Sequence, residues 1–136
     1  MILEINDAKT IADIREEFTK AYPFLCIEFY DAPHDVGETT SGRHLLPHEK
    51  MIGEVRRQQA PGILEIYPQY KTGDVEQNFK MLHGLHVQIF RRRGDSWIQT
   101  AGTDELTLEE QNEIGYSATL EILQSESNHF KSEKLL

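Results

Sequence analysis

Acidic, aromatic and imidazole side chains alternate with apolar ones in the stretches of this chain that read as strands. Within residues 24–30 and 85–90, every second side chain is apolar, and the side chains between them include Glu and His. Successive side chains of a strand point to opposite faces of a sheet, so the polar set of each strand shares one face. Carboxylates that crowd together raise one another's pKa and can then serve in acid–base chemistry. The candidate ligand-binding residues on this face are Glu4, Glu28, Tyr30, Glu65, Tyr67 and His86.

The same alternation also fits a plain sheet face in water, or a face buried against a second subunit. Antiparallel sheets often leave one side solvated. Which of the acids are neighbours depends on the order of the strands, and the sequence does not give that order.

Three histidines lie in the polar stretch of residues 31–49, at His34, His44 and His48. Two imidazoles four residues apart lie on one face of a helix and can bind a metal together with carboxylates. His44 and His48 have this spacing, but Pro47 between them is typical of the first turn of a helix and would leave His44 in the preceding loop. The three histidines are therefore candidate metal ligands, with solvation or local hydrogen bonding as the alternative. We expect no resident cofactor.

Cys26 is the single cysteine, which excludes both an intramolecular disulfide and a thiolate metal cage. It lies in a predicted strand, where a free cysteine usually behaves as a small buried hydrophobe. A Cys26–His86 pair requires the two strands to be adjacent. The chain contains no glycine-rich phosphate loop and no nucleophile elbow. No complete catalytic set is recognisable, so the sequence leaves the question of enzymatic activity open.

A short segment of the chain occurs twice. Ile2–Ile5 recurs letter for letter as Ile63–Ile66, 61 positions later. The same offset aligns Phe18 with Phe79, in the apolar stripes of two predicted helices. Because an internal repeat determines the architecture of a chain, this match predicts two halves with the same order of strands and helices.

Each half of the chain reads as a strand, a helix, two strands and a helix, with half one at 1–61, half two at 62–124 and a polar tail at 125–136. The third strand of half one is expected near 39–43. A strand–helix–strand crossover makes the first two strands of each half parallel, and a hairpin adds an antiparallel third. The sequence therefore predicts one α+β domain of two βαββα units, with a mixed, mainly antiparallel sheet and helices on one face. The strand residues expected to face the helices are Leu3, Ile5, Leu25, Ile27, Leu64, Ile66, Val87 and Ile89.

Apolar residues spaced three or four apart predict the buried sides of the helices. The stripes of the first helix in each half end at Ala21 and Leu82, and a further helix is expected at about 47–59. Thr107 and Glu110 form a capping box that opens the last helix. The expected buried stripe of that helix is Leu108, Ile114, Ala118 and Ile122, with Leu123 as a further candidate.

The chain of 136 residues has 23 acidic and 14 basic side chains and a formal net charge of −9. This charge repels phosphate backbones and anionic lipids, so we expect neither nucleic acid nor membrane as a partner. No apolar run approaches the length of a membrane span, and Met1 is followed by strand-like residues rather than a leader. We therefore expect a cytoplasmic protein.

Two classes of function fit these observations. The first is a non-catalytic binding or assembly module that uses the open sheet face or a sheet edge, with a second copy of the chain as its partner. Exposed sheet faces and edges need covering, and dimers are the commonest oligomers. The alternative is a protein that binds a small polar molecule, or an enzyme, with its site in the crevice between the halves. The residues lining that crevice are expected to be Glu4, Glu28, Glu65 and His86.

Overall fold

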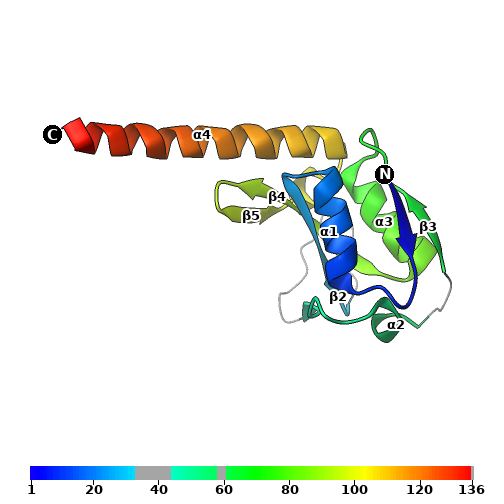
Figure 1. Cartoon of the computed structure of the whole chain (residues 1–136). Helices are drawn as coiled ribbons and strands as arrows, with labels where there is room; N and C mark the ends of the chain where they lie inside the picture. Colours follow the sequence, from blue (N-terminus) through cyan, green and yellow to red (C-terminus); the bar gives the residue numbers. More distant parts are fainter. Residues whose placement is uncertain (33–43, 58–60, 136) are drawn as a thin grey trace.

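The computed structural model describes residues 1–32, 44–57 and 61–135, and it confirms an α+β chain (Figure 1). His34 and the strand expected near 39–43 lie outside the described residues. In chain order the elements are β1 (Ile2–Ile5), α1 (Ile11–Ala21), β2 (Leu25–Tyr30), α2 (Ile52–Val55), β3 (Gly62–Glu65), α3 (Thr72–His83), β4 (His86–Arg93), β5 (Ser96–Gln99), the 3-10 helix η2 (Ala101–Thr103) and α4 (Leu108–Leu135).

The strands form two separate antiparallel sheets, β1–β3 and β2–β4–β5, instead of the single mixed sheet that was predicted. The β4–β5 hairpin was correctly predicted, and Gly94 in its turn has a φ of 62°. In the described part of the chain, the expected parallel pairing of the first two strands of each half does not occur. The predicted arrangement, a single sheet with helices on one face, is therefore not the one found.

Side chains of α1 explain why β2 does not pair with β1. Arg15 Nε donates to the carbonyl of Ile27 at 2.9 Å, and the hydroxyl of Thr19 donates to the carbonyl of Leu25 at 3.2 Å. A buried strand edge must have its polar groups satisfied. Here α1 supplies two of the partners, so the edge is occupied by a helix instead of a strand.

Residues one repeat apart meet one another in both sheets. Leu3 is the register partner of Leu64 in β1–β3, and Glu28 is the register partner of Gln88 in β2–β4. Two isolated bridges occupy corresponding places, Thr10 with Met51 and Lys71 with Thr107. The two sheet pairings join corresponding strands of the two halves. The two bridges each join the residue before the first helix of a half to the residue before its second helix.

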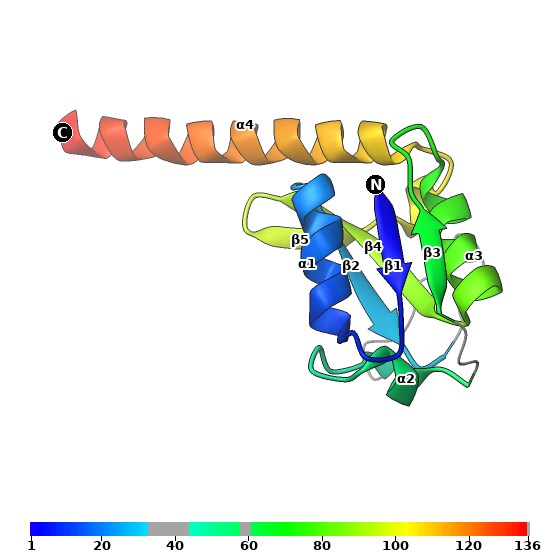
Figure 2. The same ribbon diagram turned by 45° about the vertical axis from the view of Figure 1, so that its right-hand side comes forward.

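The apolar residues predicted to face the helices form the core, which confirms that part of the prediction. All eight are at most 2% exposed. The rings of Phe29 and Phe79 meet edge to face, 6.1 Å apart, so β2 and α3 are joined at the centre of this core. Figure 2 shows α1 and α3 flanking the β1–β3 pair on opposite sides.

The buried stripes of α1 and α3 end one residue later than predicted. Ala21 and Leu82 are exposed, and the next residues, Tyr22 and His83, are buried in their place. The Tyr22 hydroxyl donates to the carbonyl of Ile66 at 3.4 Å, so this side chain closes the end of α1 onto the neighbouring sheet.

The helix predicted at 47–59 is a single turn, α2. Residues Pro47 to Lys50 form a turn, in which the Lys50 N–H donates to the Pro47 carbonyl at 3.2 Å. Met51 is extended and forms a bridge with Thr10, so the helix begins only at Ile52.

The long helix α4 lies along β4 and extends well past the β4–β5 hairpin (Figures 1 and 2). Its capping box is as predicted, with Thr107 and Glu110 exchanging hydrogen bonds of 3.1 Å. Its buried side is not. Gln111, Gly115 and Thr119 are buried with Leu108, whereas Ile114 is exposed.

The close approach of α4 to the start of β2 explains which side of the helix is buried. A Cβ placed on Gly115 would lie 3.0 Å from the Cβ of Phe24, so only glycine allows the helix to lie this close to the start of β2. Apart from Leu108, the buried residues of α4 are therefore small or polar, whereas Ile114, Leu120 and Leu123 are exposed. None of the helices in the described residues combines the length and apolar character needed to cross a membrane.

Candidate functional site

The six residues predicted to bind a ligand lie on different sheets. Glu4 and Glu65 are exposed on the outer face of β1–β3, and Tyr67 follows β3. The nearby charge of Glu65 raises the pKa of Tyr67. Glu28, Tyr30 and His86 belong to β2–β4, where Tyr30 and His86 are register partners. The structure therefore places the six in two groups.

The second sheet does not present the open face that was expected. Cys26, Tyr30 and Gln88 belong to the alternate set of side chains, yet all three are buried. Burial raises the pKa of Tyr30 to about 12, so its hydroxyl stays protonated at neutral pH. Cys26 is the register partner of Phe90, and His86 lies four residues away on the same strand, so no Cys26–His86 pair forms.

Arg15, Glu28 and His48 form a closed ring of hydrogen bonds at the edge of β2. Arg15 Nη2 donates to Glu28 Oε1 at 2.8 Å, and Arg15 Nη1 contacts His48 Nδ1 at 3.1 Å. His48 Nε2 contacts Glu28 Oε2 at 2.8 Å. A guanidinium has only donors, so Nδ1 accepts and Nε2 carries the proton. Both nitrogens of the His48 imidazole are engaged in these hydrogen bonds, so neither is left to act as a general base. The imidazole instead links the turn at Pro47–Lys50 to β2.

Of the histidines predicted as metal ligands, His44 and His48 bind different carboxylates. His44 Nδ1 pairs with Asp31 Oδ1 at 2.9 Å, whereas His48 pairs with Glu28. Over residues 1–32, 44–57 and 61–135 there is no group of three or more His, Cys, Asp or Glu side chains placed to hold a metal ion. His34 lies outside those ranges.

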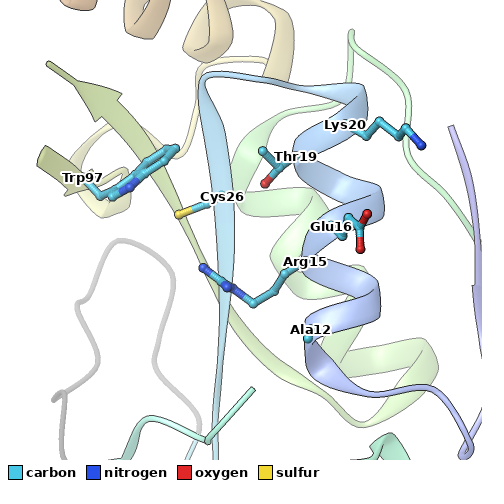
Figure 3. A pocket seen from close by; sticks show the side chains of 7 residues that line it. All are labelled: Ala12, Arg15, Glu16, Thr19, Lys20, Cys26 and Trp97. Carbon is cyan, nitrogen blue, oxygen red and sulfur yellow. The ribbon is translucent and has the colours of Figure 1, made fainter. Parts of the chain in front are cut away.

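A shallow pocket of about 480 Å³ opens between α1 and the second sheet. Figure 3 shows the Cys26 sulfur and the Trp97 ring pointing toward one another across it, with Thr19 and Arg15 on the α1 side. Burial, which outweighs the nearby Arg15 charge, raises the pKa of Cys26 to about 12. The thiol is therefore protonated at neutral pH, so the pocket offers an aromatic and apolar surface and not a nucleophile.

A third group of polar residues was missed by sequence reasoning. Glu76, Gln88, Thr100 and Asp104 are all buried, and the first three bind the backbone N–H or carbonyl of Ile89 in β4. Ile89 N–H donates to Glu76 at 2.8 Å, and the Ile89 carbonyl accepts from Gln88 Nε2 at 3.0 Å and from the Thr100 hydroxyl at 2.8 Å.

A signal for Glu76 was present in the sequence. It directly follows Val75 of the apolar stripe of α3, and it lies one repeat offset from Arg15 in α1. Arg15 follows Ile14 in the same way. Both positions border the buried side of a helix, where a long polar side chain can reach a strand edge.

No family model, curated protein or solved structure matches this chain.

Proposed function

We propose that this chain is a non-catalytic assembly module that forms a homodimer through α4. The observation that carries the proposal is a stripe of exposed apolar side chains on a helix that extends beyond its own domain. Tyr116, Leu120 and Leu123 are 51%, 39% and 49% exposed. A helix segment that extends past its own domain is only marginally stable in water by itself, so a packed partner stabilises it.

The spacing of the stripe suits helix pairing. Tyr116, Leu120 and Leu123 follow one another at intervals of four and three, which is the spacing of the two core positions of a coiled coil. The ring of Phe24 lies 5.3 Å from that of Tyr116 and extends the apolar surface onto the domain. With 28 residues, α4 is about 42 Å long, which leaves room for two copies to pack side by side.

The charges along α4 are compatible with a second copy as the partner. The chain has a net charge of −9, so copies repel one another wherever acidic surfaces meet. An antiparallel pairing places Leu120 of each copy against Leu123 of the other, and Tyr116 against Ser127. Ser117 and Gln124, which flank the stripe, are uncharged. This pairing therefore lets two acidic chains meet without opposing carboxylates along the seam.

The test is the solution mass of the full chain over a concentration series, measured by light scattering. The wild-type chain should rise from 15.7 kDa toward twice that mass. Leu120→Glu puts a charge in the seam and should keep the chain monomeric with an unchanged circular dichroism spectrum. Ser125→Glu adds the same charge on another side of α4 and should still dimerise. A wild-type chain that stays monomeric, or two variants that behave alike, would overturn the proposal.

The outer face of β1–β3 is the rival interface, because Ile2 and Ile63 are about 60% exposed there. Glu4 and Glu65 lie beside them on the same face, so two copies stacked on this face bring four carboxylates together. Ile63→Lys distinguishes the two surfaces. If that substitution abolishes the dimer and Leu120→Glu does not, the open sheet face is the interface.

We also infer that the two halves descend from one βαββα unit by duplication. The support is the matching pattern of hydrogen bonds at corresponding places. Ile11 N–H donates to the Lys50 carbonyl at 2.9 Å, and Thr72 N–H, one repeat later, donates to the Leu106 carbonyl at 2.8 Å. Synthesis of each half as a separate chain tests this, because halves of one origin should each pair with a second copy of themselves through the strands that now join the two halves.

A small-molecule site is the second candidate function, and the pocket beside Trp97 favours it over the crevice first considered. Trp97 is the single tryptophan and is 42% exposed, so its fluorescence reports directly on this pocket. Quenching of Trp97 by a non-fluorescent aromatic probe such as nitrobenzene, lost in Cys26→Phe, which fills the pocket, would support this candidate.

A further inference from the structure

The β4–β5 hairpin, which projects from the body of the domain beside α4 (Figures 1 and 2), carries three consecutive arginines in a chain whose net charge is −9. Within the described residues, none of Arg91, Arg92 and Arg93 forms an ion pair with a carboxylate. Arg91 Nη1 donates instead to Gln111 Oε1 at 2.7 Å, and Arg92 Nε donates to the Gly94 carbonyl at 2.7 Å. The described carboxylates therefore leave the positive charge of the hairpin unpaired.

β5 is an edge strand, and its outer side has no partner among the described strands. The Thr100 N–H donates to the Ile89 carbonyl at 3.2 Å, which continues the ladder between β5 and β4. Residues of an antiparallel pair alternate between hydrogen-bonded and non-hydrogen-bonded positions, so Ile98 bonds to β4 and the backbone groups of Trp97 and Gln99 point outward. No hydrogen bond to these outward N–H and carbonyl groups is found in the part of the chain that the structure describes, so they are open to an added strand.

The two faces of β5 differ in chemistry. The exposed Trp97 is the register partner of Arg92, so an aromatic ring and a guanidinium share one face. Ile98 lies on the opposite face, where a groove of about 460 Å³ between β5 and α4 includes Ile98 and Ile122 in its lining. The charged residues of this groove are one base and two acids, Arg93, Asp95 and Glu126. The groove therefore suits an apolar side chain, whereas the face with Arg92 suits an acidic one.

We propose that the outer edge of β5 is a docking site for an extended, acidic segment of a partner protein. The segment adds to the sheet as a further strand, and its backbone pairs with the outward groups of Trp97 and Gln99. Successive side chains of a strand alternate in direction, so its acidic side chains lie on the face of Arg92 and its apolar side chains enter the groove beside Ile98. The partner is therefore a segment in which acidic and apolar residues alternate.

Charge favours this partner over a second copy of the chain at the same edge. Two β5 strands paired edge to edge would bring the arginines of both hairpins together, and like charges repel. An acidic segment is attracted by the hairpin, whereas the net charge of −9 disfavours its binding to the rest of the surface. The hairpin edge is also separate from the stripe of Leu120 and Leu123, so this docking does not depend on the dimer through α4.

The test is titration of the full chain with a capped peptide of alternating glutamate and valine, followed by the fluorescence of Trp97. The emission should shift to shorter wavelength and saturate, because the added strand covers the ring. The same peptide N-methylated at every backbone amide should bind at least about tenfold more weakly, since it cannot donate to β5. Arg92→Glu and Gln99→Pro, which removes an outward N–H, should each weaken binding by about the same factor. Arg57→Glu reverses an exposed charge elsewhere and is the matched control, which should bind as the wild type does.

Comparison of the two peptides on the wild-type chain keeps the test decisive even where a variant does not fold. Absence of a fluorescence shift and of heat in calorimetry with the alternating peptide would overturn the proposal. Equal binding of the N-methylated peptide, or of a single-stranded DNA oligonucleotide, would also overturn it, because the arginines would then be a general anion site. If the wild-type chain binds no peptide and Gln99→Pro abolishes its self-association, the edge belongs to a second copy. Leu120→Glu should bind the peptide as the wild type does, so failure of the α4 dimer and failure of this site are distinguishable.

Discussion

Replacing Glu76 by glutamine should stabilise the chain at neutral pH and leave its stability nearly unchanged in acid. The carboxyl has a pKa of about 8 in the folded state, against an ordinary value of 4.5. Below 4.5 both the folded and the unfolded chain hold the proton, so ionisation has no effect on stability. As pH rises from 4.5 toward 8, the unfolded chain ionises while the folded chain stays protonated, so the wild-type chain loses stability through this window.

The size of the effect follows from the same two values. One pKa unit corresponds to about 1.4 kcal/mol, so Glu76 costs the wild-type chain about 3 kcal/mol at pH 7 and about 5 kcal/mol at pH 8 and above. Glutamine has the shape of the protonated acid, and its carbonyl can still accept the Ile89 N–H. The variant should therefore exceed the wild type by about these amounts.

Urea unfolding in a chelator at pH 4, 7 and 9 measures the difference. Glu121→Gln, which changes an exposed acid of α4, is the matched control and should shift stability by less than about 0.5 kcal/mol. If the Glu76→Gln variant differs from the wild type by the same amount at all three pH values, the reasoning is refuted, because the carboxyl would then ionise alike in both states. A variant with a lower free energy of unfolding than the wild type at all three pH values would show that the Glu76 carboxylate stabilises the chain as an anion.

Further substitutions and a thiol reaction test the packing. Gly115→Val should destabilise the chain by about 2 kcal/mol in urea unfolding, because its Cβ would lie 3.0 Å from Phe24; Gly102→Val, with open space around it, should cost far less, and equal effects would contradict the packing of α4. Cys26 should react with a disulfide reagent far more slowly in the folded chain than in concentrated guanidinium, since its pKa is raised to about 12 by burial. Fast reaction of the native chain would mean that this thiol is accessible and ionised.

Local signals in the sequence predicted local structure well. The Thr107–Glu110 capping box and the β4–β5 hairpin each depend on residues close together in the chain, and both are found where expected. The apolar alternation of the strands likewise identified the core. These features need only the period of the element and the chemistry of its ends.

Features that depend on contacts between distant residues could not be read in this way. Pairing of β1 with β2 was expected from the crossover rule, but Arg15 and Thr19 occupy the β2 edge. The face of α4 was chosen by apolar periodicity, whereas Gly115 allows a close approach that reverses it. Among the candidate site residues Glu28 has a defined role, but its partners Arg15 and His48 lie 13 and 20 positions away, and no spacing rule connects them.

The exchange of strands between the halves has a consequence for synthesis on the ribosome. Among the described strands β1 pairs with β3, and β2 pairs along its length with β4, so strands made early wait for strands made after residue 61. Pairings between residues this far apart in the sequence raise the contact order of the chain and slow its folding. Until Glu65 has left the exit tunnel, β1 has no partner among the described strands, and β2 has none until Arg93 has left it. The nascent first half is therefore the stage at which the chain depends most on chaperones or on slow translation.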